Sequence, residues 1–188
     1  MRAWGIGPGR LVIRQGDLTQ AETDAVVTAA NSRLAGGGGV DGAVHRAAGP
    51  QLLEVCRAVV AERGEIPAGQ AALTPGFALA AKWVVHAVGP IWKGGVAGED
   101  AALTGAYLSS LELAKGCGAR SIAFPAISCG AYGYPLPKAM PVALGALAQG
   151  LARGLVGRAE LWLFGAEAYQ AWCACADELF GPGFEAGA

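Results

Sequence analysis

Hydrophobic and polar positions along the chain fall into two kinds of segment. Short runs rich in β-branched and other large apolar residues indicate strands, and they are expected at residues 11–15, 25–28, 70–74, 83–88, 121–124 and 160–164. Longer stretches rich in Ala and Leu indicate helices, and they are expected at residues 40–48, 50–62, 99–115, 137–152 and 166–180. Strands that alternate with helices predict an α/β domain with a mixed, largely parallel sheet.

The chain is organised as one domain. Its 188 residues suit a single core of ordinary size, and it contains neither a linker nor an internal repeat. We therefore expect a single domain over residues 1–180. Residues 181–188 read GPGFEAGA and offer few side chains that can pack, so we expect this tail to be frayed.

The composition excludes several classes of protein. Hydrophobic residues make up 53% of the chain, charged residues 15%, and the formal net charge is -1. These values argue against disorder and against a basic surface for nucleic acid. Apolar runs stop well before the roughly 18 residues that cross a bilayer, and the N-terminal segment lacks the apolar core of a signal peptide. We expect a cytoplasmic monomer that binds neither membrane nor nucleic acid as its main partner.

The cysteines and histidines do not predict a metal centre. There are five cysteines, an odd number, and only two histidines. The cysteines are scattered and form no CxxC pair, which argues against a disulfide framework and against a zinc site. We expect reduced thiols and no metal or redox cofactor. The cysteines are Cys56, Cys117, Cys129, Cys173 and Cys175.

Two glycine-bearing loops follow predicted strands. Residues 25–49 read AVVTAANSRLAGGGGVDGAVHRAAG, in which four consecutive glycines precede the predicted helix 40–48. Glycines allow backbone N–H groups to approach an anion closely, and a helix N-terminus adds its dipole. A second loop, FPAISCGAYGYP at residues 124–135, follows the strand 121–124. Ligands of open α/β sheets bind at the carboxyl ends of the strands, so two such loops suit a pyrophosphate.

A dinucleotide-binding turn is the main alternative for the first loop. Gly37 to Gly42 formally matches GxGxxG. A Rossmann turn, however, comes directly from a strand and is followed about 20 residues later by an acidic residue that ends the next strand. Here about eight irregular residues separate strand and glycines, and residues 61–63 lie in a predicted helix. The sequence also lacks GxxxxGK[ST], so both a nicotinamide oxidoreductase and an ATPase are disfavoured.

The two loops, together with Gly16-Asp17-Leu18-Thr19, resemble the macrodomain family and in particular its MacroD-type branch. The resemblance runs from about residue 16 to about residue 169. It implies a three-layer α/β/α fold and a site for ADP-ribose, which is the ligand or product rather than a cofactor. It also implies mono-ADP-ribosylated proteins as partners.

The resemblance assigns the ends of the ligand to particular residues. Asp17 would accept a hydrogen bond from the adenine amine, although N-capping of the next turn would also explain an acid there. Phe164 would stack on adenine, although a core aromatic is the structural alternative. Asn31 would hold the distal ribose hydroxyls, although asparagine also bonds its own backbone in loops. The remaining expected contacts to ADP-ribose are Leu18, Thr28, Gly36, Gly37, Gly38, Gly39, Val40, Asp41, Ser128, Cys129, Gly130, Ala131 and Tyr132.

The expected catalytic residues surround Asp41. In hydrolases of this branch the matching aspartate lies beside the distal ribose and helps to orient or activate a water. The helix dipole would by itself explain an acid at this position. His45 lies one helical turn later on the same face, and it joins Asp41 and Asn31 as a catalytic candidate. Thr28 departs from the branch, which usually has asparagine there; threonine lacks the amide, so we expect a change of rate or linkage preference.

These residues leave three activities open. The leading hypothesis is hydrolysis of mono-ADP-ribose esters on acidic side chains, with O-acyl-ADP-ribose esters as parallel substrates. A reader that binds ADP-ribose without turnover would use the same site. Removal of a phosphate from phosphorylated ADP-ribose (ADP-ribose-1''-phosphate) is a third, weaker possibility. The glutamate pair of poly-ADP-ribose glycohydrolases is absent from the sequence.

Overall fold

The centre of the molecule is one mixed sheet of eight strands. A computed structural model of the chain describes residues 1–185. The strand order is β4-β5-β3-β6-β7-β2-β1-β8, in which the five strands from β5 to β2 run parallel and β4, β1 and β8 pair antiparallel with their neighbours. The strands are β1 (Arg2–Ile6), β2 (Gly9–Gln15), β3 (Ala25–Ala29), β4 (Ala71–Pro75), β5 (Trp83–Ala87), β6 (Ser121–Phe124), β7 (Arg158–Leu163) and β8 (Phe184–Glu185).

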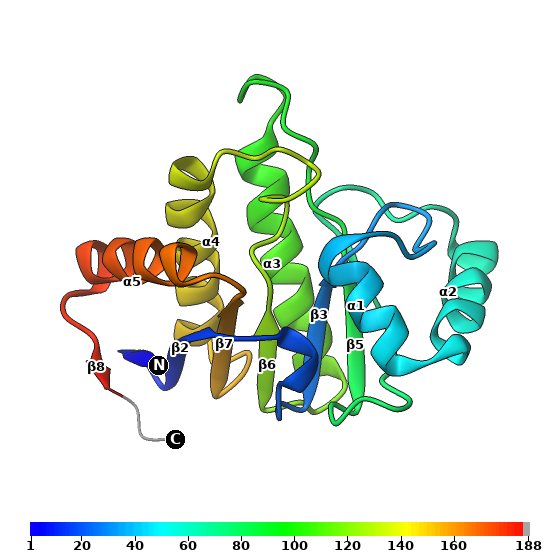
Figure 1. Cartoon of the computed structure of the whole chain (residues 1–188), viewed down its shortest axis with the longest axis horizontal. Helices are drawn as coiled ribbons and strands as arrows, with labels where there is room; N and C mark the ends of the chain where they lie inside the picture. Colours follow the sequence, from blue (N-terminus) through cyan, green and yellow to red (C-terminus); the bar gives the residue numbers. More distant parts are fainter. Residues whose placement is uncertain (186–188) are drawn as a thin grey trace.

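Five α-helices cover the two faces of this sheet and complete an α/β/α sandwich. The short 3-10 helix η1 (Leu18–Gln20) follows β2. Figure 1 shows α1 and α2 on the opposite side of the molecule from α4 and α5. Val44 and Leu52, from α1 and α2, belong to a core with Val26, whereas Leu103 and Trp172, from α3 and α5, belong to a second core. The helices are α1 (Gly39–Ala48), α2 (Pro50–Arg63), α3 (Glu99–Gly116), α4 (Leu136–Ala152) and α5 (Ala166–Phe180).

The predicted α/β class and its mixed, largely parallel sheet are confirmed. All six expected strands and all five expected helices are present, with ends that move by one or two residues. The sequence reading missed β1, because Gly5 interrupts a segment of only five residues. It also missed β8, which consists of two exposed residues. Both strands exist through pairing with neighbours rather than through a long apolar run of their own.

The C-terminal segment is tied to the first strand, which corrects the expected frayed tail for residues 181–185. Phe184 and Glu185 pair with β1. The carboxylate of Asp177 at the end of α5 accepts hydrogen bonds from the guanidinium of Arg2, at 2.6 and 3.0 Å, and from the backbone N–H of Gly183. The rest of the expectation falls on residues 186–188, which lie outside the described residues.

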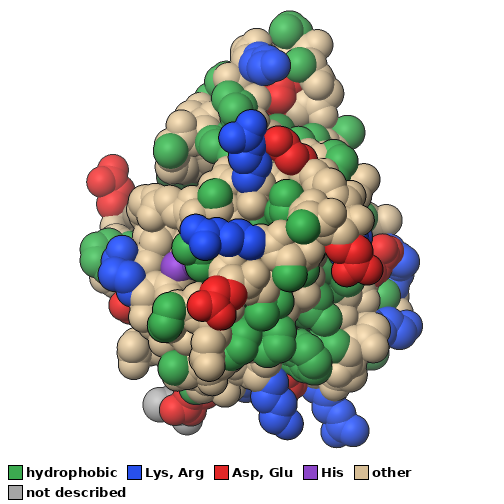
Figure 2. Space-filling model, turned by 90° about the vertical axis from the view of Figure 1, so that its right-hand side faces the viewer, with side chains coloured by type: hydrophobic (Ala, Val, Ile, Leu, Met, Phe, Trp, Pro, Cys, Tyr) green, Lys and Arg blue, Asp and Glu red, His purple; other side chains and the backbone are tan. Residues whose placement is uncertain are grey.

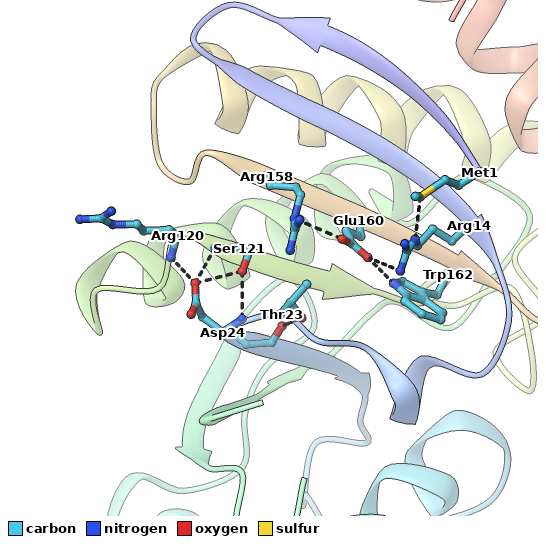
Figure 3. A network of polar contacts seen from close by, with 10 residues as sticks. Met1, Arg14, Thr23, Asp24, Arg120, Ser121, Arg158, Glu160 and Trp162 are labelled. Atoms are coloured by element: carbon cyan, nitrogen blue, oxygen red, sulfur yellow. Dashed lines mark hydrogen bonds and ion pairs between the residues drawn. The ribbon is translucent and has the colours of Figure 1, made fainter. Parts of the chain in front are cut away.

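Polar contacts fasten neighbouring strands at the edge of the sheet opposite the loops (Figure 3). Asp24, just before β3, accepts hydrogen bonds from the backbone N–H groups of Arg120 and Ser121 and from the Ser121 hydroxyl, at 2.9–3.0 Å. Burial alone would raise the pKa of the Asp24 carboxyl group, but these hydrogen bonds have the larger combined effect and lower it. The start of β3 is therefore fixed against the start of β6.

Glu160 on β7 also connects neighbouring strands through its polar contacts. Its buried carboxylate accepts a hydrogen bond from the indole of Trp162 at 2.8 Å and lies 3.2 Å from the guanidinium of Arg158 and 3.8 Å from that of Arg14 (Figure 3). A buried carboxylate is tolerated when such partners replace water. These contacts connect β7 with β2.

The surface carries charges of both signs. Figure 2 shows basic and acidic side chains interspersed among hydrophobic ones on the face that it displays. Within residues 1–185, no helix is both long enough and apolar enough to cross a membrane.

Tyr107 on α3 supports the second glycine-bearing loop from below. Its buried hydroxyl donates to the carbonyl of Pro125 and accepts from the N–H of Ile127, each at 3.1 Å. Burial raises the pKa of this phenol, so it remains protonated and able to donate. The conformation at the start of the loop after β6 therefore depends on the Tyr107 side chain of α3.

We predict that Tyr107→Phe lowers the free energy of unfolding by about 1–3 kcal/mol, because two buried backbone groups lose their partner. Urea unfolding checks this value, and Tyr169→Phe on α5 is the matched control for loss of a tyrosine hydroxyl. Equal stability of Tyr107→Phe and wild type would contradict the role given to Tyr107.

Candidate functional site

The expected site residues meet along one edge of the sheet. The five parallel strands all end there, and the loops after β2, β3, β5, β6 and β7 form a continuous rim. Such a rim at the carboxyl ends of parallel strands is the usual ligand site of an open α/β fold. The loop after β3 leads into α1 and the loop after β6 leads into α4. Because β3 and β6 are neighbours, the two glycine-bearing loops lie next to each other.

Asn31 shapes the first loop from within. Its side-chain N–H donates to the carbonyl of Gly36 at 2.8 Å, and its side-chain oxygen accepts from the N–H groups of Arg33 and Ala35. The alternative that the amide bonds its own backbone is therefore present in the structure. The contact of Asn31 with a ribose stays a prediction, and the side chain is half-buried at the rim.

The glycine run is required by backbone geometry at definite positions. Gly36 and Gly39 have φ angles of +74° and +57°, which favour glycine. A Cβ on Gly42 would lie 2.3 Å from the carbonyl oxygen of Gly37, so the first turn of α1 and the loop pack backbone against backbone. No side chain caps α1, which leaves its first N–H groups facing the rim beside exposed Gly37 and Gly38. This arrangement can hold an anion.

Asp41 is the buried carboxylate of the rim. It lies in the first turn of α1, is only 5% exposed, and accepts a hydrogen bond of 2.8 Å from the hydroxyl of Thr28 on β3. Nε2 of His45 is 3.7 Å from the same carboxylate oxygen. Burial raises the pKa of Asp41, while the Thr28 hydrogen bond and the nearby His45 act in the opposite direction. The result is a carboxylate more basic than an exposed aspartate.

A second layer of buried residues backs Asp41 and His45. His86 on β5 is fully buried, its Nε2 lies 2.9 Å from the hydroxyl of Thr74, and its ring centre is 6.0 Å from that of His45. Burial and the neighbouring His45 lower the pKa of His86 to about 3. His86 is therefore neutral and is a hydrogen-bonded residue of the core.

Cys56 completes this layer and was not singled out by the sequence. Its thiol is 3.6 Å from Nε2 of His86, and burial, with a smaller contribution from Asp41, raises the pKa of the thiol to about 12. Cys56, His45 and His86 bring their donor atoms within 4.8 Å of one another. Zinc accepts such donors, but this thiol resists ionisation and His86 is already bonded to Thr74. We assign the group a packing role behind Asp41.

The second loop presents a strained serine. Ser128 has a φ angle of +67° and is 5% exposed, and its hydroxyl is buried without a hydrogen-bond partner among the described residues. Its carbonyl accepts from the N–H of Tyr134, which closes the loop. Gly130 and Ala131 are exposed, and Tyr132 is half-buried. Strain of this kind in a rim loop is typical of binding sites.

Cys129 in the same loop is half-buried rather than freely exposed. Burial raises the pKa of its thiol to about 11, so little thiolate forms near neutral pH. Cys129 is therefore poorly suited to act as a nucleophile.

The far end of the rim lies between β2 and β7. Asp17 caps η1 by accepting from the N–H and hydroxyl of Thr19 at 2.9 and 2.8 Å, so the capping alternative holds and the carboxylate remains exposed. Phe164 is 89% exposed, which contradicts the core alternative and leaves its ring open at the rim. Leu18 is buried beneath, whereas Val40, at the start of α1, is half-buried.

The sequence reading missed the loop after β5. Gly89 lies so close to the second loop that a Cβ on it would meet the Ser128 hydroxyl at 2.1 Å. Residues 88–91 and Lys93, together with residues 65–68, line a cleft of about 520 Å³ that also includes Asn31 and Tyr132. The signal was available, because Gly89-Pro90 directly follows the predicted strand 83–88.

Comparisons with known proteins agree on one family. The Macro domain family model matches residues 27–143. A protein of Citrobacter koseri named O-acetyl-ADP-ribose deacetylase is 54% identical over 144 residues, which cover 77% of this chain and 81% of that protein. A protein of the same name from Salmonella typhimurium is 53% identical over 135 residues, 72% of this chain and 75% of that protein.

Solved structures agree with this result. The Oceanobacillus iheyensis macrodomain with ADP superposes with a TM-score of 0.90 at 38% identity, covering 94% of this chain and 95% of that one. The Trypanosoma brucei macrodomain in complex with ADP-ribose gives a TM-score of 0.80 at 38% identity, covering 88% of this chain and 68% of that one.

Proposed function

This chain belongs to the macrodomain family, and from that premise we propose that it binds ADP-ribose along its rim and hydrolyses esters at the distal ribose. The relatives named O-acetyl-ADP-ribose deacetylases support this class of reaction. O-acetyl-ADP-ribose and ADP-ribose linked to aspartate or glutamate side chains of proteins contain the same kind of ester. We propose both as substrates.

The rim offers a group for each part of ADP-ribose. Phe164 and Asp17 lie at the end proposed for adenine, where an exposed ring can stack and an exposed carboxylate can accept the exocyclic amine. The open N-terminus of α1 and the second loop, with Ser128, are proposed to hold the pyrophosphate. Asn31 and Tyr132 are proposed to hold and cover the distal ribose.

The observation that carries the proposal is the buried Asp41 beside that ribose position. A carboxylate whose pKa is raised by burial is a better proton acceptor than an ordinary aspartate. In the proposed step, water adds to the ester carbonyl carbon and gives a proton to Asp41. The bond from that carbon to the ribose oxygen breaks, and Asp41 returns the proton to this oxygen. The products are ADP-ribose and a carboxylic acid.

Thr28 provides a specific reason to retain a reader as the second candidate. Its hydroxyl donates to Asp41 at 2.8 Å, so one carboxylate oxygen is already occupied and its basicity is reduced. The same bond holds the carboxylate in one orientation. A chain in which the first effect dominates would bind ADP-ribose without turnover.

We predict that Asp41→Asn reduces release of ADP-ribose from O-acetyl-ADP-ribose and from a glutamate-linked substrate by about 10²-fold or more, because proton transfer is lost. Chromatography measures the product, and calorimetry measures ADP-ribose binding, which this nearly isosteric change retains. Glu54→Gln, an exposed acid on α2, is the matched control. Binding by wild type without any release would identify a reader.

A second prediction concerns the pH dependence of turnover. The Thr28 hydrogen bond lowers the pKa of Asp41, so Thr28→Val raises that pKa and moves the acidic limb of kcat/KM to higher pH. The variant therefore loses more activity on the acidic limb of the profile than on its plateau. Thr28→Ser keeps the hydroxyl and is expected to keep the wild-type profile, and Thr28→Asn is expected to change turnover. Superimposable profiles for the valine and serine variants would contradict this role of Thr28.

A further inference from the structure

A cleft of about 520 Å³ continues from the distal-ribose end of the rim. Asn31 and Tyr132, the residues proposed to hold and cover that ribose, both line it. An acetyl group, with only three heavy atoms, would occupy a small part of this volume, which lies within the usual range for a small-molecule site. The cleft therefore has room for a larger group attached to the ribose.

One wall of the cleft is tied to the first loop. The N–H of Ile66 donates to the carbonyl of Ser32 at 2.8 Å. The carboxylate of Glu65 accepts from the Ser32 hydroxyl at 2.7 Å and from the guanidinium of Arg33 at 3.0 Å. Three hydrogen bonds to Ser32 and Arg33, the two residues after Asn31, thus hold segment 65–68 beside Asn31. The wall is built before any ligand binds.

The opposite wall is organised around the carboxylate of Glu99 at the start of α3. It is 3% exposed and accepts from the N–H groups of Lys93, Gly95 and Ala97 at 2.9, 3.0 and 2.6 Å. Although burial opposes ionisation, these backbone bonds lower the pKa of Glu99 to about 2. The N–H of Trp92 donates to the carbonyl of Tyr132 at 2.9 Å, which joins this wall to the second loop.

The chemistry of the lining favours an aliphatic group. Its side chains are largely apolar and include Ile66, Pro67, Ala68, Pro90 and Ile91. The Glu65 carboxylate is bonded to the first loop, and the Glu99 carboxylate is bonded to the N–H groups of Lys93, Gly95 and Ala97. The exposed Lys93 side chain is the one cation among the described lining residues. Few groups remain to satisfy the N–H and C=O groups of a peptide, and an unpaired buried polar group is costly. A hydrocarbon chain needs no such partners.

We propose that this cleft binds the acyl chain of the ester and that the chain selects straight-chain O-acyl-ADP-ribose esters longer than acetyl. The inference rests on the proposed function, because it needs the distal ribose to lie against Asn31 and Tyr132. The ester oxygen lies at the mouth of the cleft, and the hydrocarbon extends between Ala68 and Ile91.

Binding of two amide-linked analogues tests the cleft without requiring turnover. In these probes an acetamido or a butyramido group replaces a hydroxyl of the distal ribose of ADP-ribose. Each methylene moved out of water contributes about 0.8 kcal/mol, or about fourfold in affinity. Since the cleft is partly open, we expect the butyramide to bind wild type about tenfold more tightly than the acetamide by calorimetry.

Two variants and a control test whether the tighter binding of the butyramide comes from the cleft. Ala68→Trp fills the cleft from an exposed position and is expected to abolish the preference while ADP-ribose itself still binds. Ile91→Asp places a charge in the wall and gives the same result if the tryptophan variant does not fold. Ala101→Trp, an exposed alanine on α3 outside the lining, is expected to keep the tenfold preference.

Equal affinity of wild type for the two analogues would overturn the inference, as would a preference that survives both Ala68→Trp and Ile91→Asp. Hydrolysis of the corresponding acetyl and butyryl esters is measured separately. Loss of ester turnover together with a retained binding preference would contradict the proposed hydrolase while leaving the acyl site in place. Turnover of both esters without a chain-length preference in binding would contradict the acyl site while leaving the proposed hydrolase in place.

Discussion

Burial of the Asp41 carboxylate is the constraint on which the site depends, because a charge taken out of water needs partners from the surrounding structure. Thr28 supplies the hydrogen bond from β3, and His45 lies one turn along α1. This bond connects the first turn of the helix to the central strand. The glycine loop between them is thereby confined, and the N–H groups proposed to hold the anion have a fixed place. The groups proposed for binding and for chemistry thus belong to one strand-loop-helix unit.

Each of two other rim loops is also held in place by one buried side chain. Tyr107 fixes the second loop from beneath, and Glu99 fixes the loop after β5 through three backbone N–H groups. Each support is a single buried side chain that satisfies backbone groups which would otherwise lack partners. The space left between the loops extends beyond the proposed ribose position. A rim built this way presents a preformed surface, which reduces the entropy that a ligand must offset on binding.

Sequence reasoning recovered what depends on local pattern. The apolar runs identified β3, β5 and β6, and the glycine run together with Asp41 identified the first loop and the start of α1. It failed where long-range pairing decides: β1 exists because it pairs with β2, and β8 exists because it pairs with β1. Cys56 and His86 converge behind Asp41 from α2 and β5, and no spacing in the sequence predicts that meeting. The cleft proposed for the acyl chain escaped for the same reason. Its two walls, residues 65–68 and 88–91, are 20 or more residues apart, and they meet because the start of β4 pairs antiparallel with the end of β5.

The proposed site requires Asp41 to be a buried, basic carboxylate next to bound ribose, and titration of Asp41 itself tests this. Carbon-13 NMR of the aspartate carboxyl groups, assigned with Asp41→Asn, follows this group against pH with and without ADP-ribose. We expect a pKa of Asp41 above the ordinary aspartate value of 3.8 and a change of that titration when ADP-ribose binds. A pKa at or below the ordinary value, with no response to ADP-ribose, would contradict it.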